Sequence, residues 1–271
     1  MQAASRESYA AAVEQLESVV ATASPAELSA TADEILAVAD MLRREPRLRR
    51  AFADPARTGE DRAGLLDAIL GGKVSERAAQ LLRGLVAGRW SSPNELLNAT
   101  EQLGVQTVLA SADKAGDLGE VEDELFRFGQ LIDANPGLAT VLGDPNAPVA
   151  QRAELVRDLL KDKAKPATVR LAELALAGYG GRGLSGSLTR LVEAAAERRD
   201  RQVAYVTTAV PLSETEESRL GERLAAMYGR DIALKVSVDP SIVGGLSVQV
   251  GNDLYDGTVS RRLAEARHAL T

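Results

Sequence analysis

Side chains that commonly carry out chemistry are scarce in this chain of 271 residues. It contains no cysteine, which excludes disulfides, thiolate metal ligands and cysteine nucleophiles, and its one histidine is His268. A metal site would therefore depend on carboxylates, and no group of Asp and Glu has the spacing of a hard-cation loop. The sequence predicts no catalytic residue, no metal site and no cofactor.

One glycine-rich stretch, Gly178–Gly183, invites comparison with a phosphate-binding loop. A P-loop follows a strand and ends in Gly-Lys-Ser/Thr, whereas this stretch follows a helical pattern and lacks that ending. Nucleotide binding and a simple interhelical turn are both open interpretations. The missing motif favours the turn.

The charge balance disfavours a nucleic-acid-binding protein. The net charge is −7 and the isoelectric point is about 5.0, whereas binding to a phosphate backbone needs a broad basic surface. The basic residues gather in one short cluster, whose members are Arg43, Arg44, Arg47, Arg49 and Arg50. This cluster is either a patch for an acidic partner or nucleic acid, or a solvated face with local ion pairs.

An internal repeat organises the first two hundred residues. The run Pro46-Arg47-Leu48, followed by Asp54-Pro55 and Arg62-Ala63, returns 90 residues later as Pro136-Gly137-Leu138, Asp144-Pro145 and Arg152-Ala153. Chance supplies single Leu–Leu matches in an aliphatic chain, but not three distinct motifs in one register. We expect the two copies to fold alike, as related helical bundles.

Within each copy the apolar residues recur with helical spacing. The segment 34–42 places Ile35, Val38, Ala39 and Leu42 on one face, and Pro46 is expected to end that helix. Helices are also expected over 62–70, from Ser75 to Gly88, and near 94–112. The small and charged residues 111–119 are the expected boundary between the copies.

The repeat also bears on three residues with functional potential. Asp54 and Asp144 could form a carboxylate pair in an enzyme cleft, but their equivalence and the prolines that follow them indicate turn or cap residues. The arginine cluster has no counterpart in the second copy, which favours local ion pairs. Trp90 corresponds to Gly180, and it either anchors a partner or packs over the turn.

From residue 201 onward the pattern becomes alternating. Three runs, 203–206, 232–238 and 246–250, alternate apolar and other residues and predict strands buried on one face. Gly251-Asn252 predicts a hairpin turn. Ser213 and Glu216 have capping-box spacing, and that helix is expected to bury Leu220, Leu224 and Met227; a last helix is expected to bury Val259, Leu263, Ala266 and Leu270.

These patterns predict a mostly α protein with two related helical bundles followed by a small α/β C-terminal domain. The expected domains are 1–112, 113–200 and 201–271. No apolar run approaches the roughly 20 residues that span a bilayer, and charges stand where a signal peptide needs its apolar stretch. We therefore expect a soluble protein whose membrane association depends on a partner.

The C-terminal region resembles a known family. The run from Asp239 to Gly251, followed by Asp256-Gly257-Thr258-Val259 and Arg262-Leu263, resembles the C-terminal signature of the ATP synthase delta subunits, also called OSCP. The segment 203–212 resembles the strand that precedes the family's charged helix, and Tyr9-Ala10-x-Ala12-Val13 is similar to its opening helix. This chain departs from the family in having Asn252 where Asp is usual, and in having a second helical copy.

The resemblance implies a mechanical role without an active site. The helical domain would hold the N-terminal helices of the alpha subunits, an amphipathic helix lying in a groove between bundle helices. The C-terminal domain would bind the b-type peripheral-stalk subunit, so that the assembly resists rotor torque during proton-driven ATP synthesis at the cytoplasmic face of the cell membrane. The signature residues that the resemblance marks as possible partner contacts are Tyr9, Ala12, Gly244, Gly245, Gly251, Asp256, Gly257, Val259 and Leu263.

Two other functions compete with this interpretation. A regulatory helical module that binds protein or RNA would need a basic or aromatic platform, which the acidity and an aromatic content of 3% disfavour. An enzyme with a carboxylate pair would need the cleft that the turn interpretation of Asp54 and Asp144 removes. Direct insertion into the membrane is not expected.

Overall fold

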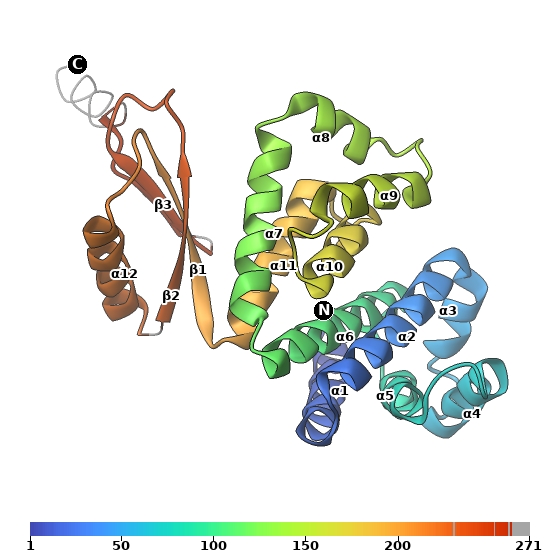
Figure 1. The fold of residues 1–271 in the computed structure, drawn as a ribbon. Coiled ribbons are helices and arrows are strands. Elements are labelled where there is room, and N and C mark those ends of the chain that lie inside the picture. The colour runs from blue at the N-terminus through green and yellow to red at the C-terminus, as the bar shows by residue number, and fades with distance from the viewer. Residues whose placement is uncertain (230, 252, 260, 262–271) are drawn as a thin grey trace, which may run out of the picture. The chain divides into compact units, whose positions relative to one another are not determined.

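The computed structural model describes residues 1–229, 231–251, 253–259 and 261 (Figure 1). Helices make up most of the described chain, and four strands form one small sheet. The predicted fold class, mostly α with a small α/β part at the C-terminal end, is confirmed. The chain divides into two compact units, which are described separately: Met1–Val121 with Thr140–Ser187, and Glu122–Ala139 with the chain from Leu188 onward.

The first copy of the repeat begins the first unit. Its helices are α1 (Ala3–Thr22), α2 (Pro25–Arg44), α3 (Pro46–Phe52), α4 (Gly59–Leu70), α5 (Glu76–Ala87) and α6 (Pro93–Ala115). The breaks fall where the sequence places them, because α2 ends before Pro46, α4 is capped by Gly71 and α5 by Gly88. The expected boundary 111–119 is itself largely helical: α6 continues through Ala115, and Gly116, at φ +81°, ends it.

The second copy repeats the pattern with the predicted spacing. Its helices are α7 (Leu118–Asp133), α8 (Pro136–Gly143), α9 (Val149–Leu160), α10 (Pro166–Leu176) and α11 (Leu184–Arg198), with the short 3-10 helix η1 (Tyr179–Gly181) before the last. The starts of α8, α9 and α10 follow those of α3, α4 and α5 by 90 residues. The division into units does not follow the repeat, because α7 and α11 each begin in the first unit and continue in the second. The domain boundaries at 112 and 200 stay a prediction.

The core of the first copy lies between α2, α5 and α6. Ile35 of α2, Leu81 of α5 and Leu103 of α6 are fully buried in one cluster. Each such side chain stabilises the fold by about 1.5–3 kcal/mol through the apolar surface that it removes from water. Helices α2 and α6 approach closely at Gly104, where an added Cβ would lie 2.5 Å from Leu36 Cδ2.

Buried arginines occupy equivalent places in the two copies. The Arg62 guanidinium donates to five backbone carbonyls at 2.7–3.0 Å, those of Asp54, Arg57, Val86, Ala87 and Gly88. Arg152, 90 residues later, donates to the carbonyls of Leu142 at 2.9 Å and Leu176 at 3.4 Å. Leu176 is the repeat equivalent of Val86. The Arg-Ala motif that revealed the repeat therefore marks an arginine that ties the ends of neighbouring helices together.

The second unit contains the sheet, with strand order β2-β1-β3-β4. Strands β1 (Arg201–Thr208) and β2 (Asp231–Val238) are parallel and are joined by α12 (Glu214–Tyr228), which lies along one side of the sheet (Figure 1). Strands β3 (Leu246–Val250) and β4 (Asp253–Asp256) form an antiparallel hairpin, and β3 also pairs antiparallel with β1. Gly251 opens the turn at φ +57°, so the predicted hairpin is confirmed.

The expectation that the strands are buried on one face is wrong for β1 and β2. One face packs Ala204, Val206 and Val248 against Leu224 of α12, as expected. On the other face Lys235 of β2 is only 4% exposed, because its Nζ lies 2.7 Å from Glu122 and 2.6 Å from Asp123 of α7. Alternation predicts a solvated side chain at this polar position, but Lys235 is buried because carboxylates more than a hundred residues earlier pair with it.

Helix α12 buries a narrower stripe than the sequence predicts. Met227, expected in the buried stripe of this helix, is 61% exposed, whereas Leu224 is buried as predicted. The residues of α12 that pack on the sheet are Leu220, Leu224, Ala225 and Tyr228. These positions centre the buried stripe on Leu224 and leave Met227 at its edge. Helical periodicity therefore identified the correct face of the helix, but the buried stripe is narrower than predicted.

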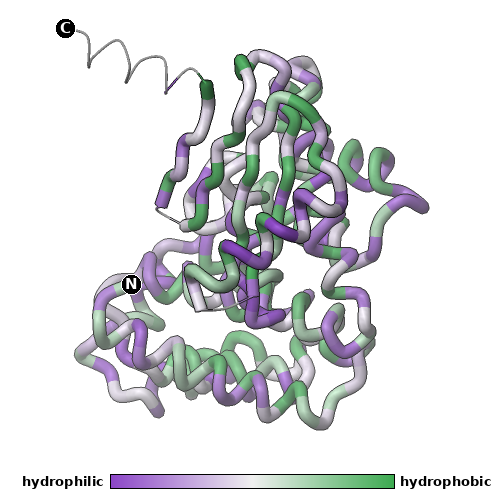
Figure 2. Tube along the Cα trace, turned by 90° about the vertical axis from the view of Figure 1, so that its left-hand side faces the viewer, coloured by the Kyte–Doolittle hydropathy of each residue, from purple (hydrophilic) through white to green (hydrophobic). Residues whose placement is uncertain are grey.

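Apolar and polar residues are mixed throughout the described helices and strands. Figure 2 shows hydrophobic and hydrophilic residues alternating along both kinds of element, as expected for elements that bury one face. Within the described residues no helix has both the length and the apolar character needed to cross a bilayer. Of the residues expected in the last helix, Leu263, Ala266 and Leu270 lie outside the described residues, as does His268.

Candidate functional site

The glycine pair of the C-terminal signature makes a close backbone contact. Gly244 and Gly245 have φ values of +109° and +84°, a region that side-chain-bearing residues rarely adopt. A Cβ at Gly245 would collide with the carbonyl oxygen of Gly257 and lie 2.9 Å from Thr258 Cα. Because both obstacles are backbone atoms, no side-chain rotation would relieve the collision. The glycines therefore permit the segment 256–259 to cross the start of β3.

Hydrogen bonds hold this crossing in place. The Gly257 N–H donates to the Leu246 carbonyl and the Val259 N–H donates to the Gly244 carbonyl, both at 3.0 Å. The Asp256 carboxylate accepts the Thr258 N–H at 3.0 Å, and this bond holds the pKa of the Asp256 carboxyl below its usual range. We call the residues that meet here the signature cluster, namely Gly244, Gly245, Asp256, Gly257 and Val259.

The remaining signature residues lie elsewhere. Gly251 forms the β3–β4 turn, and Leu263 lies outside the described residues. Tyr9 and Ala12 belong to α1 in the first unit, where Ala12 is 2% exposed and Tyr9 packs against the same core. Ala12 is therefore a core residue of the first copy and does not present its side chain to a partner.

An exposed apolar edge that the sequence analysis missed lies beside the signature cluster. Val210 follows the end of β1, Val238 is the last residue of β2 and Val243 precedes β3; they are 66%, 46% and 70% exposed. The Asp239 N–H donates to the Thr208 carbonyl at 2.8 Å, and Thr208 pairs with Leu246, so these segments share one end of the sheet. We call these three residues the valine edge. In the sequence, these valines could have been noticed as apolar residues in segments next to Pro211 and Pro240, where polar residues are usual.

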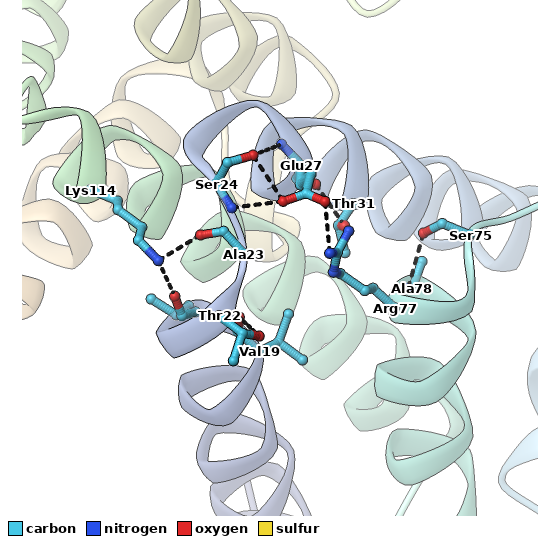
Figure 3. Close-up of polar contacts among 11 residues, drawn as sticks. Val19, Thr22, Ala23, Ser24, Glu27, Thr31, Ser75, Arg77, Ala78 and Lys114 are labelled. Carbon is cyan, nitrogen blue, oxygen red and sulfur yellow. Dashed lines mark hydrogen bonds and ion pairs between the residues drawn. The ribbon is translucent and has the colours of Figure 1, made fainter.

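In the first unit, polar side chains bind three helices and a turn together at the start of α2 (Figure 3). The Glu27 carboxylate accepts from the Ser24 backbone N–H and hydroxyl at 2.8 and 2.9 Å and pairs with Arg77 of α5 at 2.7 Å. Lys114 of α6 donates to the Ala23 carbonyl at 2.5 Å. The bonds from Ser24, reinforced by Arg77, lower the pKa of Glu27 to about 2. This is a structural corner with an ionised carboxylate, not an acid–base pair.

The other motifs with functional potential have structural roles. The glycine-rich stretch forms the turn between α10 and α11 that includes η1, where the Gly180 N–H donates to Glu101 at 3.3 Å. In the arginine cluster, Arg43 pairs with Glu101 and Arg44 with Asp40, each at 2.7 Å. These observations support the turn and the local ion pairs over nucleotide or nucleic-acid binding.

Trp90 and the two aspartates also match their simpler interpretations. Trp90 is 8% exposed, and its indole Nε1 donates to the Leu85 carbonyl at 2.9 Å, so it packs over the turn. Asp54 accepts the Ala56 N–H and Asp144 the Asn146 N–H, each at 2.9 Å, which makes both turn residues. Across the residues that the structure describes, no three of His, Asp and Glu are grouped as a metal ion would require.

The chain was compared with known proteins. Residues 105–270 match the sequence model of the family described as ATP synthase delta (OSCP) subunit, so the match begins within α6. The protein named "ATP synthase subunit delta" of Salinispora arenicola is 63% identical over 100% of this chain and 99% of its own length. The protein of the same name is 61% identical over the same shares in Salinispora tropica, and 43% identical over 98% and 97% in Streptomyces avermitilis.

The family match includes the sheet, the valine edge and the signature cluster, and the relatives also cover the first copy. Identity at this level over the full length leaves no room for a chance resemblance. The chain belongs to the ATP synthase delta (OSCP) subunit family.

Proposed function

We propose that this chain is a peripheral-stalk subunit of an F-type ATP synthase and has no active site of its own. Its helical part binds the N-terminal helices of the alpha subunits, and its C-terminal part binds the b-type stalk subunit. The observation that carries the proposal is the family match over residues 105–270, which spans the second copy and the C-terminal sheet. In this role the chain resists rotor torque while proton flow drives ATP synthesis.

The division of labour follows the predicted domains. Residues 1–112 and 113–200 are two helical domains, one of which holds the catalytic head, and residues 201–271 form the stalk-binding domain. The chain works at the cytoplasmic face of the cell membrane, as a peripheral protein held there by its partners. The described helices give it no segment of its own that could cross the bilayer.

The valine edge is the surface that we assign to the stalk partner. An amphipathic helix binds by placing its apolar face on exposed apolar side chains, and Val210, Val238 and Val243 offer such side chains within one module. The signature cluster fixes the segment that carries Val243, because the carbonyls of Gly244 and Leu246 accept the N–H groups of Val259 and Gly257. The glycines would thus act by positioning the contact surface, not by touching the partner.

Reconstitution tests the assembly role. Membrane vesicles containing the complex are stripped of this chain, and proton-driven ATP synthesis is measured before and after the full chain is added back. We expect synthesis to be lost and then restored, and the tagged chain to recover alpha and b subunits. Recovery of RNA without either subunit would instead favour the regulatory module, and failure to restore synthesis would contradict the stalk role.

A glycine substitution tests the C-terminal contact. Gly245→Ala should weaken recovery of the b subunit while alpha is still recovered, because the left-handed conformation costs a side-chain-bearing residue about 1–2 kcal/mol and the backbone of residues 257 and 258 blocks the new Cβ. Gly221→Ala on α12 is the matched control, since its Cβ would meet Leu234 at an ordinary 3.7 Å. Equal recovery of the b subunit by both variants would show that its binding does not depend on the signature cluster.

A further inference from the structure

The proposed function assigns no role to one pocket in the first copy. Its volume is ≈ 430 Å³, and it lies between α3, the turn 53–57 and the segment 90–93 that leads into α6. All of these residues belong to the first unit and precede residue 105, where the family match begins. A function of this pocket would therefore belong to the part of the chain outside the family match.

The floor of the pocket is apolar and fixed. Trp90 lines it together with Pro55 and Pro93, and the hydrogen bond from the Trp90 indole to the Leu85 carbonyl holds the ring in one orientation. Prolines have few conformations to lose, so this surface is already formed before anything binds. Such a floor suits an apolar side chain.

The rim of the pocket is positively charged. Arg50 is exposed, and none of the described carboxylates lies within ion-pair distance of its guanidinium. Arg57, 48% exposed, is 3.6 Å from Asp54, whose other carboxylate oxygen is engaged by the Ala56 N–H. Two arginines and one partly engaged carboxylate thus line the pocket, which leaves a net positive charge.

The second copy provides an internal comparison. The positions 90 residues after Arg50, Arg57 and Trp90 are Thr140, Ala147 and Gly180, which lack both the charge and the aromatic floor. Asp54 and Pro55, which shape the turn, are kept as Asp144 and Pro145. The repeated scaffold therefore forms without two arginines and a tryptophan at these positions.

We propose that this pocket binds an acidic residue of a protein partner, with an apolar side chain beside that residue resting on Trp90. Guanidinium groups match carboxylates through paired, charge-assisted hydrogen bonds, and an apolar floor next to them selects a segment in which both kinds of side chain are adjacent. The complementarity is local, since the chain as a whole carries a net charge of −7.

Other anionic ligands fit the pocket less well. Recognition of acidic lipids rests on clusters of roughly four to eight basic residues, and only two arginines line this pocket. Phosphate binding by backbone amides needs free N–H groups, but the Ser91 N–H already donates to Ser5 at 2.9 Å and the Glu95 N–H to the Ser92 hydroxyl at 3.3 Å. Within the lining, the Arg50 and Arg57 side chains carry the positive charge that an anion would meet.

Trp90 is the one tryptophan of the chain, so its fluorescence reports on this pocket alone. The full-length protein is titrated with a blocked pentapeptide in which Glu precedes Leu, and with the same peptide carrying Gln in place of Glu. We expect a saturable change in Trp90 emission, with binding of the Gln peptide weakened ~10-fold or more, because each charge-assisted hydrogen bond is about twice as strong as a neutral one.

Variants assign the effect to the rim. The double variant Arg50→Gln, Arg57→Gln should bind the Glu peptide ~10-fold or more weakly than the natural chain. Arg47 is an exposed arginine of α3 outside the pocket, so Arg47→Gln should leave the affinity unchanged. Far-UV circular dichroism checks that the double variant is folded. Equal binding of both peptides or of both variants would overturn the proposal. So would a larger emission change with inorganic phosphate, or with phosphatidylcholine vesicles containing phosphatidylserine.

Discussion

The two copies of the repeat share a scaffold but differ in how completely it is bonded. In the first copy the Arg62 side chain donates five hydrogen bonds, all to main-chain carbonyls. These carbonyls belong to the turn before α4 and to the end of α5. In the second copy Arg152 reaches the carbonyls of Leu142 and Leu176, and among the described residues its buried Nε has no hydrogen-bond partner. The same residue in the same register therefore stabilises the two copies to different degrees.

This difference shows what a sequence repeat conserves and what it leaves free. A guanidinium has five N–H donors in a fixed fork, so it can close several helix ends at once if the carbonyls converge on it. Convergence depends on the precise path of the neighbouring turns, and these differ in sequence between the copies. The arginine defines the scaffold, and the surrounding turns determine how much stability it provides.

Removing the two arginines should produce the largest contrast. Arg62→Ala should lower the free energy of unfolding by about 3–5 kcal/mol, because five backbone carbonyls lose their charged donor, and Arg152→Ala by only about 1–3 kcal/mol, because two do. Urea unfolding followed by circular dichroism measures both, with Arg47→Ala as the exposed control. If Arg152→Ala lowers the free energy of unfolding as much as Arg62→Ala does, the number of hydrogen bonds does not determine how much each arginine stabilises its copy.

Helix packing gives an intermediate effect. Gly104→Ala should destabilise by about 1–2 kcal/mol, since overpacking against Leu36 outweighs the better helix propensity of alanine. The equivalent residue in the second copy is already Ala194, which is buried. If Gly104→Ala left the free energy of unfolding unchanged, close packing against Leu36 would not explain why the first copy has glycine where the second has alanine.

A double-mutant cycle sharpens this test. Combined with Leu36→Ala, the cost of Gly104→Ala should fall to near zero, because the obstructing side chain is gone. Gly129→Ala on α7 is the matched control, since apart from its own stretch of helix backbone nothing lies within 4 Å of its Cβ position. A loss of stability at Gly129 as large as that at Gly104 would point to the helix backbone and not to packing.

The smallest expected effect depends on pH. The folded state lowers the pKa of Glu27 from 4.5 to about 2, so the carboxylate contributes stability that is present above pH 4.5 and is lost as pH falls toward 2. Glu27→Gln should therefore be less stable than the natural chain at pH 7, and the gap should narrow below pH 4.5. Urea unfolding at pH 7, 5 and 3.5 measures the gap.

Exposed Glu14 of α1 supplies the control for this pH series. If Glu14→Gln shows the same narrowing as Glu27→Gln, the effect reflects overall charge and not the bonded corner. A gap at Glu27 that stays constant from pH 7 to pH 3.5 would also contradict the lowered pKa. The second copy has Asp117 at the equivalent position, where it pairs with Lys165 at 3.0 Å, so both copies anchor this helix start with an acid.

Much of the fold could be predicted because its signals are local. Pro46, Gly71 and Gly88 mark helix ends through their own backbone preferences, and the capping box of Ser213 and Glu216 is contained in four residues. The repeat could be found because Arg62 and Arg152 occupy the same register. The signature cluster could be named from its residues, although the crossing at Gly245 needed the structure.

What could not be predicted depends on partners far away in the chain. Lys235 looks like a solvated strand position, and only the carboxylates of Glu122 and Asp123 explain its burial. The pocket under Arg50 joins two segments about forty residues apart, so neither the arginine cluster nor Trp90 revealed it alone. Single-residue patterns report which side of an element is apolar, but not what covers its other side.

The placement of α6 has a consequence for how such a chain can change length. Helices α1, α6 and α11 begin at residues 3, 93 and 184, so α6 closes the core of the first copy and also stands where an opening helix of the second would stand. A genetic gain or loss of about 90 residues, cut at these helices, would leave a chain that still starts with a helix of this kind. A single recombination event could then interconvert long and short versions of the protein, because the contacts between the opening helix and the rest of the copy would already exist.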